Sequence, residues 1–422
     1  MMEKQTKIGT VCSDFDTFQL KSVLVKNDAG DWGNELDKDA IGVIRSTNFN
    51  NDGRLDLSDI AYRTLSKRKF EEKKLYASDI LIERSGGSET QPVGRVGFIT
   101  DEIAETDYAF ANFIQRISLN DNVNAKFVYY CLQQMYEMGI TAGMQSQTTG
   151  IRNLDWKQYI KVLLPKPSIS EQTAIAAILS KVDEAIASVQ ASIAAAERLK
   201  KSLMQNLLTG RMKPDGTLRK EDEFYVDEKF GRVPLGWEVK RIDEISERKT
   251  EVIDPTKTKE IYDYIGLEHI LPDEFVRCGK GLSNETVALK VKFETGDLLY
   301  GKLRPYLNKV FISDISGVGS TEFIVLKQNE FTNWVYLNFQ LKKFLDYTKS
   351  MTAGTQHPRA SWKDIKHYLV SIPKNEQERK QITKELLSLE QRKKTNNDKI
   401  AVLERLKKSL MQNLLTGRVR VK

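Results

Sequence analysis

The sequence contains one block of fifteen residues twice. The stretch ERLKKSLMQNLLTGR fills positions 197–211 and again positions 404–418, and every residue is identical. An offset of 207 positions brings the two copies into register. Two identical blocks of this length do not arise by chance. The chain is therefore expected to consist of two halves built on one plan, each ending in the same helix.

Each block ends a long stretch in which apolar residues recur with a seven-residue period. A heptad seam sustained for about five heptads is typical of a coiled coil. Because each seam would otherwise stay exposed, we expect the two helices to pack on each other as an antiparallel pair. The seam positions of the first half are Ile175, Val182, Val189, Ala196 and Leu203, with Leu179, Ile186, Ile193, Lys200 and Leu207. Those of the second half are Ile382, Leu389, Asn396, Leu403 and Leu410, with Leu386, Lys393, Ile400, Lys407 and Leu414.

The polar seam residues and the helix ends carry further expectations. Asn396 and Lys393 are expected to fix the register of the pair, as polar seam residues commonly do. Lys200 and Lys407 lie near the helix ends, where a lysine can extend to water. Both helices end in Thr-Gly, and glycine readily takes the left-handed conformation that caps a helix. A two-residue insertion between Gln377 and Ile382 is expected to distinguish the start of the second helix.

The segments upstream of the helices agree in outline only. TAGMQ at 141–145 matches TAGTQ at 352–356, each between a helix-like stretch and a segment with one tryptophan. Apolar runs predict strands at 40–46, 79–84 and 93–99 in the first half and at 261–267, 297–302, 308–313 and 321–327 in the second. The sequence thus predicts an α+β protein with a pseudo-two-fold repeat. The expected parts are a first globule at 1–165, a long helix at 166–212, a linker at 213–232, a second globule at 233–373 and a second long helix at 374–422.

Composition and charge limit the class of protein. The net charge of +7 is concentrated in residues 374–422, which hold 14 basic and 6 acidic residues. If the globules bind nucleic acid, their contacts must therefore come from local patches. Three scattered cysteines exclude a disulfide scaffold, and neither a signal-peptide core nor a long apolar run occurs. We expect a cytoplasmic protein that makes no membrane contact.

Motifs for catalysis are missing from the sequence. There is no NPPY-like methyltransferase motif and no Walker phosphate-binding loop, and the three histidines are not at metal-ligand spacing. The cysteines have no neighbouring histidine and are expected to be small packing residues. The sequence therefore favours a protein with no catalytic, metal-binding or cofactor-binding residues of its own.

This arrangement resembles the specificity subunit of a type I restriction–modification system. The resemblance covers nearly the whole chain and rests on GRVPLGWEVKRIDEI before the second globule and on the two helices that end in LLTG. The chain departs from the pattern before the first globule, where it has no counterpart of Pro234-Leu-Gly-Trp237. The order of the parts, globule, helix, globule, helix, is more specific than any single motif.

The resemblance implies a role in DNA recognition. Each globule would be a target-recognition domain that reads one half of a bipartite, asymmetric site in double-stranded DNA, and the helices would space the two domains. The identical blocks would then present equivalent docking surfaces to two modification (methyltransferase) subunits. S-adenosylmethionine would bind to those partners and not to this chain, and a translocating restriction subunit would be a third component.

Candidate DNA-binding residues follow from side-chain chemistry. Arginine pairs with guanine, and glutamine or asparagine pairs with adenine, so the loops after TAG are the first candidates. Flexible glycines next to cations make two further loops candidates for phosphate contacts. The candidates after TAG are Gln145, Gln147, Thr148, Thr149, Arg152, Asn153, Gln356, His357 and Arg359, and the others are Arg84, Arg95, Lys302, Arg304 and Tyr306.

Other interpretations of these features remain open. The candidate loops could be ordinary polar surface loops or hairpins, and the chain could be a coiled-coil scaffold that spaces two protein-interaction domains without binding DNA. An enzyme with an unrecognised site is the third possibility. Residues assigned to subunit docking or to the helix spacer are Leu199, Leu203, Leu207, Leu406, Leu410 and Leu414.

Overall fold

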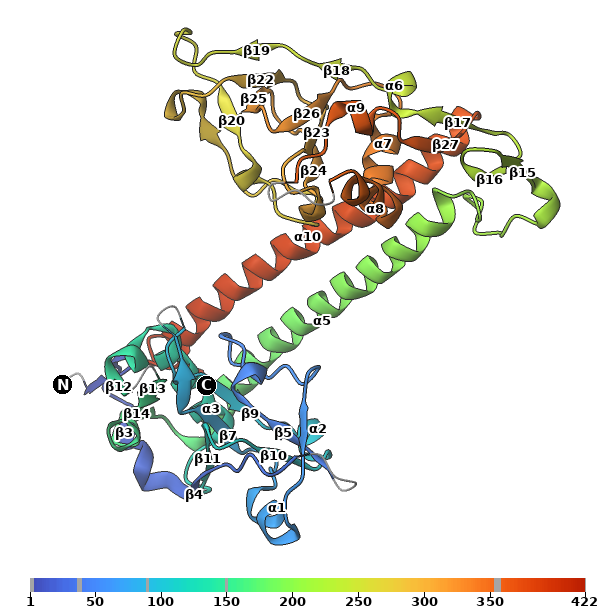
Figure 1. Ribbon diagram of the computed structural model, residues 1–422. Coiled ribbons are helices and arrows are strands. Elements are labelled where there is room, and N and C mark those ends of the chain that lie inside the picture. The colour runs from blue at the N-terminus through green and yellow to red at the C-terminus, as the bar shows by residue number, and fades with distance from the viewer. Residues whose placement is uncertain (1–3, 36–39, 89–90, 149–150, 353–357, 422) are drawn as a thin grey trace. The chain divides into compact units, whose positions relative to one another are not determined.

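The computed structural model divides the chain into two compact units (Figure 1). It describes residues 4–35, 40–88, 91–148, 151–352 and 358–421. The first unit comprises residues 1–190 and 398–422, and the second comprises residues 191–397. The chain passes from one unit to the other inside each long helix, so each unit contains one globule and half of each helix.

The two long helices are α5 (Ile169–Leu207) and α10 (Glu376–Leu414), each 39 residues long. In the first unit the beginning of α5 pairs with the end of α10, and in the second unit the end of α5 pairs with the beginning of α10. The predicted antiparallel pair is therefore confirmed. Seam residues of both helices, such as Ile175, Leu179, Ile382 and Leu386, are fully buried.

The predicted insertion at the start of the second helix is wrong. Both helices have the same length, and both of their ends are related by the same offset of 207 positions. Glu171 of α5 therefore corresponds to Glu378 of α10. Each of these carboxylates binds an arginine that follows a helix end, Arg420 and Arg219 respectively.

The described residues of the first unit form five small sheets and four short α-helices besides the long ones. The helices are α1 (Lys67–Lys73), α2 (Asp101–Ala104), α3 (Ala125–Glu137) and α4 (Trp156–Tyr159). The strands, in sheet order, are β1 (Lys4–Thr6) and β2 (Gly9–Val11); β10 (Tyr108–Phe110), β5 (Ile41–Ile44) and β6 (Ala61–Arg63); β4 (Leu24–Ala29), β11 (Ile114–Leu119), β7 (Ile80–Glu83) and β9 (Val96–Phe98); β12 (Gln145–Thr148), β13 (Ile151–Leu154) and β8 (Ser85–Gly87); β14 (Leu163–Lys166) and β3 (Asp16–Gln19).

In the second unit, the part of the chain that the structure describes forms four sheets and four short α-helices besides the long ones. The helices are α6 (Ile242–Ile245), α7 (Thr332–Phe339), α8 (Lys342–Met351) and α9 (Trp362–Ile365). The strands, in sheet order, are β15 (Phe224–Asp227) and β16 (Gly231–Pro234); β17 (Trp237–Arg241) and β27 (Leu369–Pro373); β18 (Arg248–Lys249), β26 (Phe323–Leu326), β23 (Leu298–Gly301) and β24 (Val310–Ile312); β19 (Val252–Ile253), β22 (Lys290–Phe293), β25 (Gly317–Ser320), β20 (Asp263–Ile265) and β21 (Gly281–Leu282).

The two globules share one topology. The antiparallel order β4-β11-β7-β9 in the first matches β18-β26-β23-β24 in the second. A parallel pair with an antiparallel neighbour also recurs, as β10-β5-β6 and β25-β20-β21. The globules differ along the chain, where helix α1 follows β6 in the first and strand β22 follows β21 in the second. All seven predicted strands are present, and the helix-like stretch 332–351 is divided into α7 and α8 at Leu341.

The first globule begins in the same way as the second, although its sequence differs. The hairpin β1–β2 leads into β3, which pairs with β14, just as the hairpin β15–β16 leads into β17, which pairs with β27. Residues 4–19 thus replace the Pro-Leu-Gly-Trp segment that the sequence comparison found only in the second half. Strand pairing is made by the backbone, so equivalent hairpins do not require similar side chains.

The identical blocks form the base of each globule. Met204, Leu207 and Leu208 pack with Trp237 and Trp334 in the core of the second unit. Their copies Met411, Leu414 and Leu415 pack with a different set of residues, including Phe18 and Tyr130, in the core of the first unit. Each block therefore packs on the globule that does not directly precede it in the sequence.

Candidate nucleic-acid interface

The hairpin after TAG in the first unit lies beside the segment that carries Arg84. Strands β12 and β13 pair antiparallel from Gln145↔Leu154 to Thr148↔Ile151, and β13 also pairs with β8. The Ser85 hydroxyl donates to Asn153 Oδ1 at 2.6 Å. Two candidate loops that are far apart in sequence therefore form one three-stranded sheet.

The candidates in this sheet differ in exposure and in partners. Arg84 is half-buried and its guanidinium donates to Gln115 Oε1 at 3.3 Å, while half-buried Gln145 donates to the Thr141 carbonyl, also at 3.3 Å. Arg152 and Asn153 are half-buried on β13. Gln147 and Thr148 lie on β12, opposite Arg152 and Ile151. Thr149 lies outside the described residues.

Arg95 has a structural position instead. Its side chain is buried and forms a double hydrogen bond with the buried carboxylate of Glu83, at 2.8 and 2.7 Å. The same guanidinium donates to the backbone carbonyls of Phe49 and Ser46. A buried arginine with four of its five N–H donors bound inside the protein holds strands together and is not exposed to a phosphate. We therefore do not include Arg95 in the proposed interface.

The second unit brings its candidates together in the same way. Leu303 forms a β-bridge with Arg359, the Arg304 amide donates to the Pro358 carbonyl at 2.8 Å, and the Ala360 amide donates to the Lys302 carbonyl at 3.0 Å. The last contact corresponds to the bond from the Leu154 amide to the Arg84 carbonyl at 2.8 Å in the first unit. Arg304 and Tyr306 are exposed, and Gln356 and His357 lie outside the described residues.

Positive charge gathers at this position in the second unit. Burial lowers the pKa of Lys302, and the nearby Arg248 and Arg359 lower it further, while Glu322 opposes them. Exposed Arg359 donates through Nε to Glu322 Oε2 at 3.2 Å. Arg248, exposed on β18, was missed by the sequence analysis because it lies 54 positions from Lys302 and on no recognisable motif. Three cations around one carboxylate form a local patch of the kind that the charge distribution requires.

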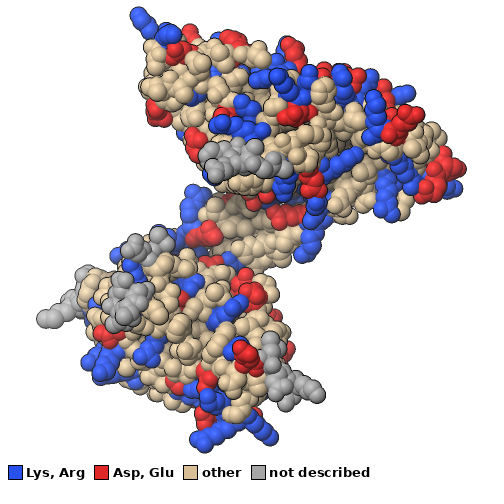
Figure 2. Space-filling view, in the orientation of Figure 1, with Lys and Arg blue, Asp and Glu red and all other residues tan. Residues whose placement is uncertain are grey.

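Charge is mixed over the rest of the visible surface. Figure 2 shows Lys and Arg side chains interspersed with Asp and Glu on each unit. Mixed charge of this kind gives little long-range attraction to a polyanion, since opposite charges cancel beyond about 10 Å at moderate salt. Contacts with nucleic acid would therefore depend on short-range patches such as that of Lys302.

The six residues assigned to subunit docking or to the spacer fall into three pairs. Leu207 and Leu414 are buried in the cores, and Leu203 and Leu410 are half-buried against those cores. Leu199 and Leu406 are 50% and 45% exposed. Only this last pair is thus available to another subunit, and the other four leucines have an intramolecular role.

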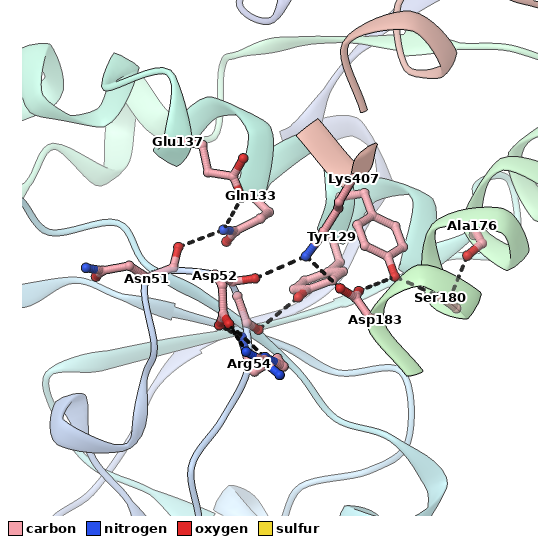
Figure 3. A network of polar contacts seen from close by, with 12 residues as sticks. Asn51, Asp52, Arg54, Tyr129, Gln133, Glu137, Ala176, Ser180, Asp183 and Lys407 are labelled. Atoms are coloured by element: carbon pink, nitrogen blue, oxygen red, sulfur yellow. Dashed lines mark hydrogen bonds and ion pairs between the residues drawn. The ribbon is translucent and has the colours of Figure 1, made fainter. Parts of the chain in front are cut away.

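The prediction that Lys200 and Lys407 extend to water is wrong. Lys407 is buried, and its ammonium lies 2.8 Å from Asp183 Oδ1, while Tyr130 donates to the other oxygen of Asp183 at 2.7 Å (Figure 3). Lys200 pairs in the same way with Glu390, which also accepts from Tyr336 at 2.9 Å. Burial raises the pKa of both tyrosines, so their hydroxyls are protonated donors at neutral pH.

The described residues show neither a metal site nor a membrane-spanning helix. Among them, no group of three His, Cys, Asp or Glu side chains is arranged to hold a metal ion. No helix within the described part of the chain is both long and apolar enough to cross a membrane.

A duplicated globule that is mounted on an antiparallel helix pair defines a class of DNA-recognition subunits. The chain matches the type I restriction modification DNA specificity domain over residues 12–198 and 234–405, and it belongs to this family. It is a DNA specificity subunit of a type I restriction–modification system, with two target-recognition domains and no catalytic role. In this family the methyltransferase that binds S-adenosylmethionine is a separate subunit.

Individual proteins show the same likeness. A Methanocaldococcus jannaschii protein named as the MjaX specificity subunit of a type I restriction enzyme is 22% identical over 99% of this chain and 97% of its own length. The EcoDI specificity subunit of Escherichia coli is 26% identical over 60% of each chain. The crystal structure of the type I restriction–modification S subunit from M. genitalium aligns with a TM-score of 0.58 at 17% identity, covering 98% of this chain and 99% of that one. At that identity the structure supports the fold alone.

Proposed function

We propose that each globule reads one half of a bipartite DNA site and that the helix pair sets the gap between the halves. The observation that carries this proposal is a contrast between two regions of each globule. One is the base, which packs on an identical helix block, and the other is the set of candidate DNA-binding loops. The bases of both globules pack on identical helix blocks, while the candidate loops carry different side chains on equivalent backbone positions. A constant helix surface that carries globules with variable loops suits two domains that recognise different bases at a fixed separation.

The proposed interface of the first unit is the sheet β12-β13-β8. It contributes Arg84, Gln145, Gln147, Thr148, Arg152 and Asn153, and the proposal extends to Thr149, which follows Thr148 in the sequence. A two-stranded ribbon fits the major groove of B-DNA, and amide and guanidinium groups are suited to its base edges. The hairpin therefore has both the shape and the chemistry of a base reader.

The proposed interface of the second unit is the patch around Lys302. Lys302, Arg304, Tyr306 and Arg359 contribute to it, and Arg248 is added from the structure; the proposal extends to Gln356 and His357. Glu322 holds Arg359 through Nε, which leaves the remaining donors of that guanidinium for a guanine or a phosphate. Both the bridge to Leu303 and this ion pair orient the arginine before DNA arrives.

The proposed docking surfaces for two methyltransferase subunits are centred on Leu199 and Leu406. Arg198 and Lys201 flank Leu199, and Arg405 and Lys408 flank Leu406; all six side chains are exposed. The two surfaces are identical in sequence and occupy equivalent helix positions, so two copies of one partner could bind in the same way. A restriction subunit would join this assembly, and the proposed location of the assembly is the cytoplasm.

Mapping of methylated bases tests this function directly. The chain is expressed with its methyltransferase subunit in cells that lack other modification systems, and the genome is sequenced for modified bases. We expect one asymmetric motif with two specified halves and an unspecified gap. If DNA is methylated without a bipartite motif, or if the chain makes no difference to methylation, a scaffold that does not bind DNA becomes the better description.

A further inference from the structure

In each globule, one loop extends to the helix pair, and we call this loop the arm. The first arm, residues 49–55, follows a short helix (Ser46–Asn48) after β5 and is closed by a bridge between Phe49 and Leu55. The second arm, residues 270–277, follows a short helix (Leu267–His269) after β20 and is closed by a bridge between Ile270 and Arg277. The two arms occupy the same place in the topology, although FNNDGRL and ILPDEFVR share no pattern.

The first arm contacts both helices of its unit. The Asp52 carbonyl accepts from Lys407 of α10 at 3.3 Å (Figure 3). The Arg54 guanidinium donates to Gln190 of α5. Asp52 and Arg54 also pair with each other on the arm. Helix α3 supports the tip, because Tyr129 donates to the Gly53 carbonyl at 2.8 Å. The arm is therefore held at its tip by three helices.

The second arm makes equivalent contacts with different chemistry. The Phe275 ring lies 5.1 Å from the Lys200 ammonium, in a cation–π arrangement. The Glu274 carboxylate binds Lys393 of α10, and Lys393 also lies 2.7 Å from Glu197 of α5. In both units, therefore, the tip of the arm contacts the seam lysine of the identical block.

Four parts of each unit thus meet at one lysine. Around Lys407 these parts are α10, the carboxylate of Asp183 on α5, Tyr130 on α3 and the arm at Asp52. Around Lys200 the corresponding groups are Glu390 on α10, Tyr336 on α7 and Phe275 on the second arm, and Gln340 adds a further acceptor at 2.7 Å. Around the repeated lysine, the same junction is built twice from partners that lie outside the identical fifteen-residue block.

A buried ion pair is an inefficient way to stabilise a protein, since desolvation offsets most of the attraction between the charges. An apolar residue at the same seam position would pack at least as well. What the ion pair adds is direction, because an ammonium satisfies its three donors only when its acceptors occupy particular places. A lysine at this junction therefore defines the angle between a globule and its helices.

We propose that Lys407 and Lys200 are positioning residues, each of which fixes the orientation of one recognition domain on the helix pair through the arm. The inference rests on the proposed function, in which the gap between half-sites is set by the helices. A recognition domain that could change its orientation on the helix pair would accept half-sites whose gap is one base pair shorter or longer. The two lysines would then determine how strictly the gap is read.

The test compares DNA substrates that differ only in gap length. The full chain in complex with its methyltransferase subunit is assayed on duplexes with the cognate gap and with gaps one base pair shorter or longer. We expect the preference of the wild type for the cognate gap to fall about tenfold in Lys407→Met and in Lys200→Met, with half-site bases unchanged. Lys399→Met and Lys384→Met, at exposed positions of α10 in the first and second units respectively, are the controls and should retain the preference. Lys407→Arg, which keeps the charge, should retain most of it.

A second variant guards against loss of folding. Lys407→Met leaves half-buried Asp183 without its cation, whereas Lys407→Met with Asp183→Leu removes both charges and should restore thermal stability. We expect the folded double variant still to accept altered gaps. Unchanged gap preference in this variant overturns the inference, and so does an equal loss of methylation at all three gaps. A wild type that is indifferent to the gap would instead show that the proposed function of the helices fails, and the inference with it.

Discussion

The two copies of the fifteen-residue block have the same structure in different surroundings. Gly210 and Gly417 end their helices with φ of 66° and 70°, and the lysines of the two blocks bind a carboxylate that also accepts from a tyrosine. The surroundings differ, because the first block faces Pro234 and Trp237 and the second faces Cys12 and Phe15. Identity of the block therefore does not require identical neighbours. It requires neighbours that fill the same space and supply the same hydrogen-bonding groups.

The contrast between base and loops extends this lesson. At the base, both globules pack against the same helix surface with different side chains. These side chains fill the same space and supply equivalent hydrogen-bonding groups. In the candidate interface, the globules place different side chains on equivalent backbone positions, so they diverge in chemistry while sharing geometry. The first region is under the constraint of one packing partner, and the second is free to fit a different half-site in each unit.

Substitution at the helix-capping glycine should produce the largest effect. A Cβ at position 210 would lie 2.2 Å from Pro234 Cγ, and the backbone there is left-handed. We expect Gly210→Ala to destabilise the second unit by about 2–5 kcal/mol, from backbone strain and overpacking together. Gly417→Ala should act on the first unit in the same way through Cys12 and Phe15. Hydrogen exchange of peptides from each unit measures the two effects separately.

The control for the glycines is Gly216→Ala. Its φ is 86°, but a Cβ there would meet nothing within 4 Å, so only the backbone cost of about 1–2 kcal/mol applies. If Gly210→Ala and Gly216→Ala proved equally destabilising, close packing of the block against the globule would not be what requires the glycine.

The interface of the second unit should respond in one half-site only. Arg359→Ala removes an exposed guanidinium that Glu322 orients, and we expect it to weaken reading of one half-site by about 1–3 kcal/mol. The other half-site should be unaffected. Lys363→Ala, an exposed cation on α9 of the same unit, is the matched control. Sequencing of methylated bases from cells with each variant measures the effect. An unaltered methylation profile for Arg359→Ala would mean that Arg359 is an ordinary surface residue that does not contact DNA bases.

A smaller effect with a defined pH dependence is expected at the base of the first unit. Hydrogen bonds from Arg420 and from the Val421 amide hold the pKa of Glu171 below its usual value of 4.5. A carboxyl with a lowered folded-state pKa stabilises the fold above its unfolded pKa, and this contribution is lost as the pH falls through the folded-state pKa. Glu171→Gln should therefore cost about 1 kcal/mol at pH 7, and this cost should decrease as the pH falls below the usual value of 4.5.

Thermal unfolding at several pH values measures this difference. Glu184→Gln, at an exposed position on α5, should show no such dependence. A cost for Glu171→Gln that stayed constant down to pH 3 would mean that Arg420 recognises the shape of the side chain rather than its charge.

The sequence predicted what periodicity and repetition encode. The helix pair follows from the heptads, and the capping glycines follow from their place after the last turn. The strands follow from apolar runs such as DILIER and TEFIVLK. These features are local, so a short window of sequence contains the information needed to infer them.

The sequence did not predict contacts between distant segments. The pairing of Ser85 with Asn153 and the patch around Lys302 depend on strands that are neighbours only in the folded chain. The sequence also contained no indication of burial, which is why buried Arg95 was included among the candidates for phosphate contacts. One signal was available but unused: acidic residues at 183 and 390 share the offset of the repeat, and Tyr130 and Tyr336 share an offset one position shorter. That pattern could have indicated partners for Lys407 and Lys200.

The most direct test of the account lengthens the helix pair without touching either globule. Four residues are inserted in α5 between Gln190 and Ala191 and four in α10 between Asn397 and Asp398, where the two units meet along the chain. Each insertion adds close to one turn and about 6 Å of rise, a little under two base pairs at about 3.4 Å each. Methylated-base sequencing should show both half-sites with unchanged bases and a gap longer by one or two base pairs. Altered half-site bases with an unchanged gap would contradict the account, because the helices would then not determine the separation that the protein reads.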